Sequence, residues 1–237
     1  MSEKVVRRGY VETDKQEFSK ESIVVLKKAF EEIYWLIDRG YPLSPAATFV
    51  SNHYLLSSRQ RIALSRAVTT TASLTERKRK EVFTCDNKTV HIDAFNLIIT
   101  LETALSNSTL IKCMDGTIRD LAGLRGTYRL IDKTDSAIIL TGEKLKSLNI
   151  AKAVFYLDAP VSNTGNLKVR ILELLSGYGY GISVELESKV DSLLKTKDYV
   201  VTSDGIILND CISWINLAES VISENIRSAE YINFLPY

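Results

Sequence analysis

Three short apolar segments of this chain end in aspartate, at positions where carboxylates could share one chemical site. The segments TVHID, AVFYLD and DYVVTSD end at Asp93, Asp158 and Asp204, and their β-branched and aromatic residues are typical of strands. In an open parallel sheet the carboxyl ends of the strands line one edge, where ligands bind. Asp191, at the predicted start of a helix, can reach the same edge. We therefore predict that the four carboxylates converge.

A cluster of carboxylates is a natural site for a hard divalent cation. Two unit charges 4 Å apart repel by about 4 kcal/mol at an effective dielectric constant of 20, so converging carboxylates need a cation or shared protons. The chain has only two histidines and three scattered cysteines, without a CxxC pair or an HExxH motif, which disfavours zinc. Carboxylate-held Mg²⁺ or Mn²⁺ suits phosphoryl chemistry, because it activates water and offsets the phosphate charge.

Capping is the alternative role for these aspartates, because Asp often caps the turn or helix that follows a strand. The chain holds 13 aspartates, and the coincidence of three of them with predicted strand ends favours a shared site. Glu102, nine residues after Asp93, lies on the following predicted helix and could point toward the site or away from it.

The second half of the chain alternates between strand-like and helix-like segments. Predicted strands cover 89–93, 153–158, 181–187 and 198–204, and predicted helices cover 95–106, 134–149, 164–176, 188–196 and 209–226. This alternation predicts βαβ units, a parallel sheet and an α/β domain of three layers. The final residues, YINFLPY, either add an edge strand or lie on the surface.

The first half of the chain is helical and basic. Apolar residues recur at steps of three and four from Ile23 to Ile37, and further helices are predicted after Ser44-Pro45 and after Ser57 or Ser58. Residues 1–84 hold 15 Lys and Arg against 10 Asp and Glu, whereas residues 85–237 hold 15 against 19. We therefore predict a helical N-terminal domain over 1–84 and an α/β domain over 85–237.

Composition excludes several classes of protein. Of all residues, 45% are hydrophobic and 25% are charged, which is ordinary for a globular protein. No apolar run reaches the roughly 20 residues that span a membrane, and no signal peptide precedes the charged start, so a cytoplasmic protein without a membrane partner is expected. The absence of GxGxxG and Walker motifs argues against dinucleotide and P-loop chemistry.

Several motifs resemble a known enzyme family. VHIDAFNLI resembles the opening strand of PIN-like and NYN-type ribonucleases, in which Asp-x-x-Asn follows an apolar strand. VVTSDGIIL resembles the closing motif of that family, and KVDSLL is similar to its helix start before that motif. The whole chain also resembles an uncharacterised prokaryotic family that joins a helical N-terminal domain to a PIN-like C-terminal domain. The resemblance implies a three-layer PIN-like fold and a metal-dependent nuclease, most simply an endoribonuclease using Mg²⁺ or Mn²⁺.

The same resemblance implies roles for individual residues. The catalytic acids and metal ligands would be Asp93, Asp158, Asp191 and Asp204. Asn96 would orient the first ligand or touch substrate, and Ser203 in the closing motif would also contact substrate. PIN domains carry a further acid on an early helix, a position that Glu102 could fill.

The segment 114–129 mixes both charges between glycines. Its charged residues include Asp115, Arg119, Asp120, Arg125 and Arg129. A solvated, salt-bridged loop is one account; in the other, the three arginines grip backbone phosphates and Asp120 binds substrate or joins the metal site. MDGTIRD also resembles the nucleophile loop of HAD-type phosphatases, but Cys113 stands where their nucleophilic aspartate would be.

The expected partner is nucleic acid, with RNA favoured over DNA, and a homodimer is a possible assembly. Between Arg59 and Lys80 there are seven Lys or Arg and one acid, which fits either a solvated face or a phosphate-contacting surface. Two alternatives to a nuclease stay open. One is a non-catalytic nucleic-acid-binding or adaptor protein on a PIN-like fold, and the other is a phosphatase or nucleotide-binding enzyme.

Overall fold

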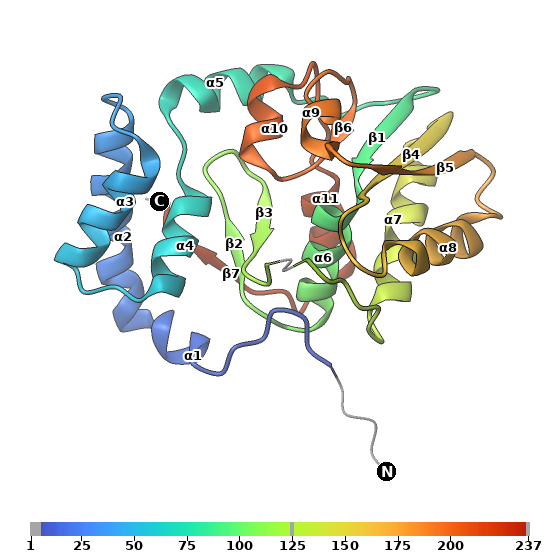
Figure 1. Ribbon diagram of the computed structural model, residues 1–237. Coiled ribbons are helices and arrows are strands. Elements are labelled where there is room, and N and C mark those ends of the chain that lie inside the picture. Colours follow the sequence, from blue (N-terminus) through green and yellow to red (C-terminus); the bar gives the residue numbers. More distant parts are fainter. Residues whose placement is uncertain (1–5, 124–125, 236–237) are drawn as a thin grey trace, which may run out of the picture.

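A computed structural model of the chain describes residues 6–123 and 126–235 (Figure 1). The helices are α1 (Asp14–Glu17), α2 (Lys20–Ile37), α3 (Leu43–His53), α4 (Ser58–Ala67), α5 (Thr71–Lys80), α6 (Ala94–Leu105), α7 (Thr134–Ser147), α8 (Thr164–Leu175), α9 (Val190–Leu194), α10 (Gly205–Asp210) and α11 (Leu217–Asn225). The strands are β1 (Thr89–Asp93), β2 (Leu110–Lys112), β3 (Ile118–Asp120), β4 (Lys152–Asp158), β5 (Gly181–Glu187), β6 (Val200–Val201) and β7 (Tyr231–Asn233). None of these helices is both long and apolar enough to cross a bilayer.

Four strands form a parallel sheet in the order β5-β4-β1-β6, so the mixed α/β class predicted from the sequence is confirmed. The chain steps outward from β1 to β4 and β5, and then returns to place β6 on the other side of β1. The strand order therefore reverses between β1 and β6, and the crevice above such a reversal is the usual ligand site of an open parallel sheet.

Helices cover both faces of this sheet, as the alternation of side chains along β4 requires. Phe155 and Leu157 join a core that includes residues of α6, α7, α8 and α11. Val154 and Tyr156 point into a separate cluster with α9, α10 and Trp214. The sheet thus lies between two helical layers.

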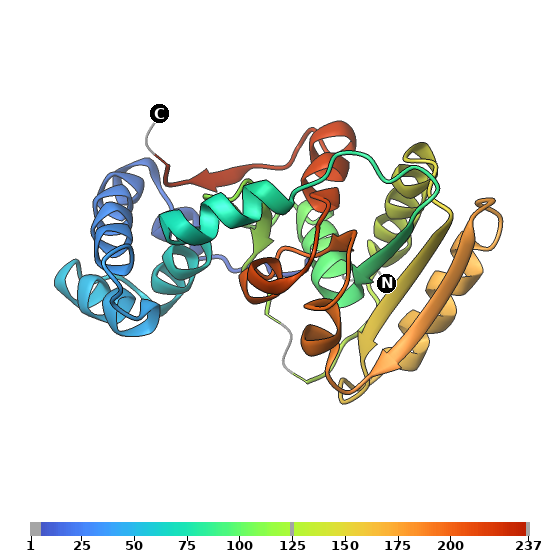
Figure 2. The same cartoon turned by 90° about the horizontal axis from the view of Figure 1, so that it is seen from above.

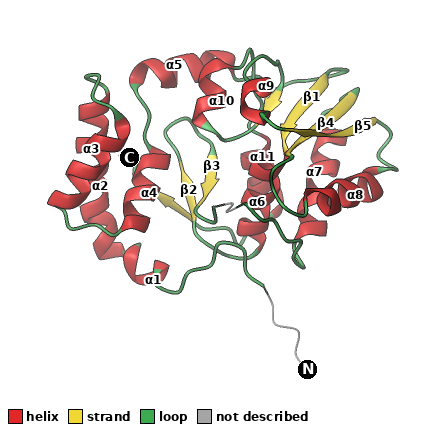
Figure 3. Ribbon diagram, viewed as in Figure 1, coloured by secondary structure: helices red, strands yellow, loops and turns green. Residues whose placement is uncertain are grey.

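A second, three-stranded sheet of order β3-β2-β7 was not predicted as a sheet (Figure 3). Its strands have three residues each, too few for an alternating pattern to stand out in the sequence. Strand β7 pairs in parallel with β2, so the edge strand anticipated near the C-terminus exists, and Figure 2 shows it running back toward the N-terminal helices. Ile111, Cys113 and Phe234 from this sheet region share one core with α2, α3 and α4.

Extended backbone separates two pairs of neighbouring helices. The predicted helix over 209–226 is two helices, because the Trp214 N–H bonds to the Lys80 carbonyl and the Ile215 N–H to the Val200 carbonyl. These non-helical bonds anchor the connection to the sheet and to the end of α5. The helix that opens at Ser57, with a capping box to Gln60, ends at Ala67, and α5 then starts afresh behind a Thr70 cap.

Candidate active site

A cavity of about 840 Å³ lies between the carboxyl edge of the parallel sheet and the N-terminal helices. Its acidic lining residues are Asp93, Asp120, Asp158, Asp191 and Asp204, and we call it the acidic cavity. Its basic lining residues are Arg66, Arg77 and Arg119, and its exposed apolar residues include Tyr41 and Ile206. The helical part and the α/β part of the chain therefore each supply one wall.

The four aspartates singled out in the sequence all line this cavity. Asp93 ends β1 and Asp158 ends β4, two strands that pair directly. Asp204 precedes α10 just after β6, the neighbour of β1 on its other side, and Asp191 lies in the first turn of α9. The parallel strand order is thus what brings residues more than 100 positions apart to one place.

Asp93 is the innermost carboxylate of the group, with 8% of its surface exposed. It caps α6, where Oδ1 accepts the Asn96 N–H at 3.4 Å, and Oδ2 accepts the Thr202 hydroxyl at 2.9 Å. Capping is therefore one role of Asp93, as the alternative account proposed. It does not use all the lone pairs of a carboxylate, so Asp93 retains capacity for another donor or a cation.

The opening and closing motifs are bonded to each other. Asn96 Oδ1 accepts both the backbone N–H of Ser203 at 2.8 Å and its hydroxyl at 2.9 Å. Thr202 Oγ1 in turn accepts the Asp204 N–H at 3.1 Å. Asn96 and Ser203 line the acidic cavity, and the hydrogen bonds between them fix the position of the Asp93 backbone relative to the Asp204 backbone.

Asp204 keeps its carboxylate at the cavity while capping α10. Its Oδ1 accepts the Ile206 N–H at 2.7 Å. Asp158 and Asp204 are half-buried, whereas Asp191 is exposed. Across residues 6–123 and 126–235, none of the four predicted ligands forms an ion pair with Lys or Arg.

Burial and neighbouring like charges raise the pKa of Asp93, Asp158 and Asp191. Burial raises the pKa of Asp93 to about 7, with smaller contributions from Asp204 and Asp158. Burial and the charge of Asp191 raise the pKa of Asp158, and burial and the charge of Asp204 raise that of Asp191. The like charges of these aspartates therefore act on one another across the cavity.

The raised pKa of Asp93 predicts a pH-dependent stability in buffer that contains a chelator. Because the pKa in the folded chain, about 7, exceeds the ordinary value of 3.8, ionisation of Asp93 opposes folding as the pH rises toward 7. Each pH unit in this range costs the wild type about 1.4 kcal/mol in free energy of unfolding. The difference in free energy of unfolding between Asp93→Asn and the wild type should therefore shift by about 2–3 kcal/mol in favour of the variant from pH 5 to pH 7. Urea unfolding at both pH values measures this, with the exposed Asp132→Asn as control. An equal gain in both variants would contradict the prediction.

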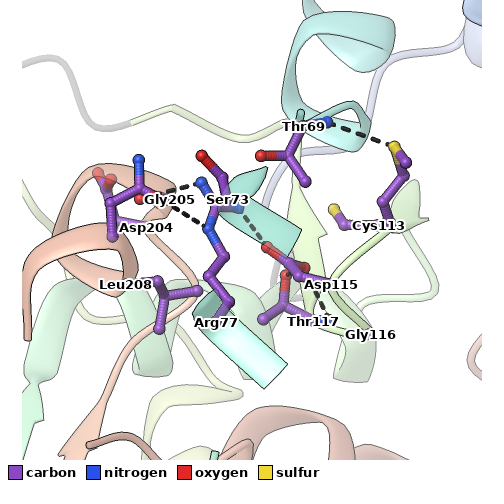
Figure 4. A network of polar contacts seen from close by, with 12 residues as sticks. Thr69, Ser73, Arg77, Cys113, Asp115, Gly116, Thr117, Asp204, Gly205 and Leu208 are labelled. Carbon is purple, nitrogen blue, oxygen red and sulfur yellow. Dashed lines mark hydrogen bonds and ion pairs between the residues drawn. The ribbon is translucent and has the colours of Figure 1, made fainter. Parts of the chain in front are cut away.

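A buried ion network joins the helical wall to the hairpin that carries the MDGTIRD segment (Figure 4). Arg77, with 5% of its surface exposed, donates to Asp115 Oδ2 at 2.6 Å and to the Gly205 carbonyl at 3.1 Å. Arg119 also donates to Asp115 Oδ2, at 3.1 Å. The adjacent arginines hold the pKa of Asp115 below its ordinary value despite burial. Asp115 is thus an ionised carboxylate whose charge is balanced by two arginines, and it does not line the acidic cavity.

Of the remaining residues that were predicted to contact substrate, Arg119 and Asp120 line the acidic cavity and Arg129 does not. Arg119 lines the acidic cavity, and its buried Nε has no hydrogen-bond partner among the described residues. Asp120 lines the cavity and accepts the Thr100 hydroxyl at 3.0 Å and the Ala122 N–H at 2.8 Å. Arg129 is exposed and is not among the lining residues, and Arg125 lies outside the described residues.

Glu102 belongs to a different polar cluster. It is fully buried and accepts Arg8 Nε at 2.7 Å and the Tyr128 hydroxyl at 2.5 Å. Tyr128 is fully buried as well and packs against Phe95, with ring centroids 5.3 Å apart. Glu102 therefore anchors the N-terminal segment, and Tyr128 is a core residue that a base cannot reach.

The lining of the acidic cavity fits a magnesium-like ion, because it offers carboxylate oxygens. No histidine or cysteine is among its lining residues. Within the described residues, no three His, Cys, Asp or Glu side chains are already close enough to form a ready-made metal site. A cation would therefore have to draw the carboxylates together by rotating side chains.

Two arginines that the sequence did not mark as site residues, Arg66 and Arg77, also line the cavity. Arg66 lines it from the end of α4 and donates to the Asp120 carbonyl. Arg77 belongs to a run of four cations, residues 77–80, and nothing in the sequence distinguished it from the other three. Four consecutive residues go once around a helix, so at least one of them must face the side on which the helix packs. Thr202, which bonds Asp93, could have been recognised from its place before the closing Ser-Asp pair.

Comparisons with known proteins find relatives whose functions are not described. The family "Domain of unknown function (DUF5616)" matches residues 82–220, and "Protein of unknown function (DUF434)" matches residues 25–80. The uncharacterized protein MJ0935 of Methanocaldococcus jannaschii is 38% identical over 185 residues, which cover 77% of this chain and 88% of the relative. No solved structure matches the chain.

Proposed function

This chain belongs to the DUF5616 family, and we propose that it is a metal-dependent nuclease with a PIN-like α/β part, acting on RNA in preference to DNA. The observation that carries the proposal is the meeting of Asp93, Asp158, Asp191 and Asp204 in one cavity. None of these four carboxylates pairs with a Lys or Arg among the described residues, and a bound Mg²⁺ or Mn²⁺ ion would offset their charges.

The chain's own residues divide the work of phosphodiester hydrolysis. The four aspartates would hold the ion, and Asn96 and Ser203 would keep the Asp93 and Asp204 backbones aligned. The bound ion supplies activation of water and compensation of phosphate charge. Arg66 and Arg119, on the facing wall, can donate to phosphate oxygens and orient the scissile bond.

Cleavage that depends on a divalent ion is the direct test. Purified wild-type protein should cleave 5′-labelled oligoribonucleotides in Mg²⁺ or Mn²⁺ and should not cleave them in EDTA, with product lengths resolved on a denaturing gel. Oligodeoxyribonucleotides of the same sequence should be cleaved more slowly. Absence of cleavage of varied RNA and DNA with either ion would overturn the proposal. Binding that persists in EDTA without turnover would favour a non-catalytic nucleic-acid-binding protein.

A further inference from the structure

A second hollow of about 490 Å³ opens beside the acidic cavity, between α3 and α4. The lining residues that matter here are Leu43, Thr48, Arg61, Ile62, Ser65 and Arg66, and we call this hollow the α3–α4 groove. Leu43, Ser65 and Arg66 line the acidic cavity as well. The two hollows therefore adjoin each other across these three residues, and the groove lies on the helical part beside the carboxylates.

The groove is positively charged and has no acidic residue. Between Asp38 and Glu76 the sequence contains four arginines and not one Asp or Glu. Within the described residues, the Arg61 guanidinium makes no hydrogen bond or ion pair. Arg66 donates to the Asp120 carbonyl, with 3.6 Å between Nη1 and Asp120 Oδ1. An extended polyanion leaving the acidic cavity would meet these two cations in succession.

Apolar side chains stand beside these cations. Ile62 is 48% exposed and Leu43 is 37% exposed, and Tyr41, which is 58% exposed, lines the acidic cavity. A single-stranded nucleic acid offers matching chemistry, with phosphates for the arginines and unstacked bases for the apolar and aromatic surfaces. A duplex keeps its bases stacked inside and would set the apolar residues against phosphates.

We propose that the α3–α4 groove binds a single polynucleotide strand as it continues out of the acidic cavity. This groove lies in the part of the chain that matches DUF434, apart from the α/β part that carries the acids. The assignment rests on the proposed nuclease function for the identity of the strand, but its binding can be measured without cleavage.

Fluorescence anisotropy in EDTA tests the groove with fluorescein-labelled U20 and dT20 as probes. Arg61→Glu should weaken the binding of both 20-mers by about tenfold or more and should reduce the salt dependence by about one phosphate contact. Lys28→Glu is the matched control, because Lys28 is an exposed cation of α2 that lines neither hollow. The control should weaken binding by less than about threefold.

Duplex and polyglutamate competitors identify the occupant. Arg61→Lys should restore binding of the 20-mers, and circular dichroism of each variant reports whether the fold survives. If Arg61→Glu fails to fold, Arg61→Gln takes its place. Three results would each overturn the groove assignment. The first is an equal loss of binding in Arg61→Glu and Lys28→Glu, and the second is a loss in Arg61→Glu that is as large for a 20-bp duplex as for the single strands. The third is displacement of the labelled strand by polyglutamate as readily as by unlabelled 20-mer.

Binding and cleavage report separately on the two proposals. If the wild type does not cleave but its binding of 20-mers depends on Arg61, the nuclease proposal is wrong and the groove stands. If the wild type cleaves but binding is indifferent to Arg61, the groove assignment alone is wrong. For a cleaving wild type, Arg61→Glu should raise the KM for a 20-mer and leave kcat unchanged, because Arg61 does not line the acidic cavity.

Discussion

Asp204→Asn should abolish metal-dependent cleavage, with a loss of roughly 10²-fold or more, while the protein remains folded. The carboxylate contributes a charged oxygen to the acidic cavity, and an amide does not replace that charge. Asn is about as good a helix cap as Asp, so the Ile206 N–H at the start of α10 keeps its acceptor. Initial rates of cleavage of a labelled oligoribonucleotide, with Mn²⁺ at saturation, give the effect.

Asp210→Asn is the matched control for this experiment. Asp210 ends the same helix, does not line the cavity and forms an ion pair with Lys195 at the surface. Its activity should stay within about twofold of the wild type, since exposed pairs contribute little. Added Mn²⁺ should raise the melting temperature of the wild type and of Asp210→Asn, but not that of Asp204→Asn. Retained cleavage by Asp204→Asn would remove the metal-ligand role from this residue.

Arg77→Met should lower the free energy of unfolding by about 3 kcal/mol, the largest effect we expect on stability. Removal of one partner leaves the buried Asp115 carboxylate with Arg119 alone, and breaking a buried pair in this way typically costs about 3–5 kcal/mol. The same change removes the donors to Asn209 Oδ1 and to the Gly205 carbonyl. Urea unfolding followed by circular dichroism measures the difference.

Arg79→Met, two positions along α5, provides the comparison. The Arg79 guanidinium pairs with Glu76, and both side chains are more than half exposed. Such surface pairs contribute about 0–1 kcal/mol, so this variant should unfold at nearly the wild-type urea concentration. Similar losses in the two variants would mean that the ion network around Asp115 does not stabilise the interface between the two parts of the chain.

The sequence predicted the parts of the site that depend on long, regular elements. Strands β1 and β4 carry clear apolar runs, and the rule that parallel strands end on one edge was enough to bring Asp93 and Asp158 together. Asp204 was placed at the end of a predicted strand over 198–204; the strand is only Val200–Val201, but the residues after it still reach the same edge of the sheet. The mixed α/β class with a parallel sheet followed from the same alternation of elements.

The opposite wall of the cavity could not be predicted, because it depends on contacts between segments distant in sequence. Strands β2 and β7 are three residues each and pair across more than 100 positions. The orientation of Arg77 depends on α10 packing against α5, which no local pattern reveals. The role of Glu102 was open for the same reason, since its partner Arg8 approaches from the start of the chain.

The pairing of β7 with β2 has a practical consequence for anyone who would divide this chain. A fragment that begins after residue 84 retains Ile111, Cys113 and Phe234 but loses the helices that cover them. Their apolar surface would then be exposed to solvent. Such a fragment would be prone to aggregate. Its failure to cleave RNA would therefore not test the role of the aspartates. Expression of this protein for assays should therefore include both the N-terminal helices and the C-terminal strand.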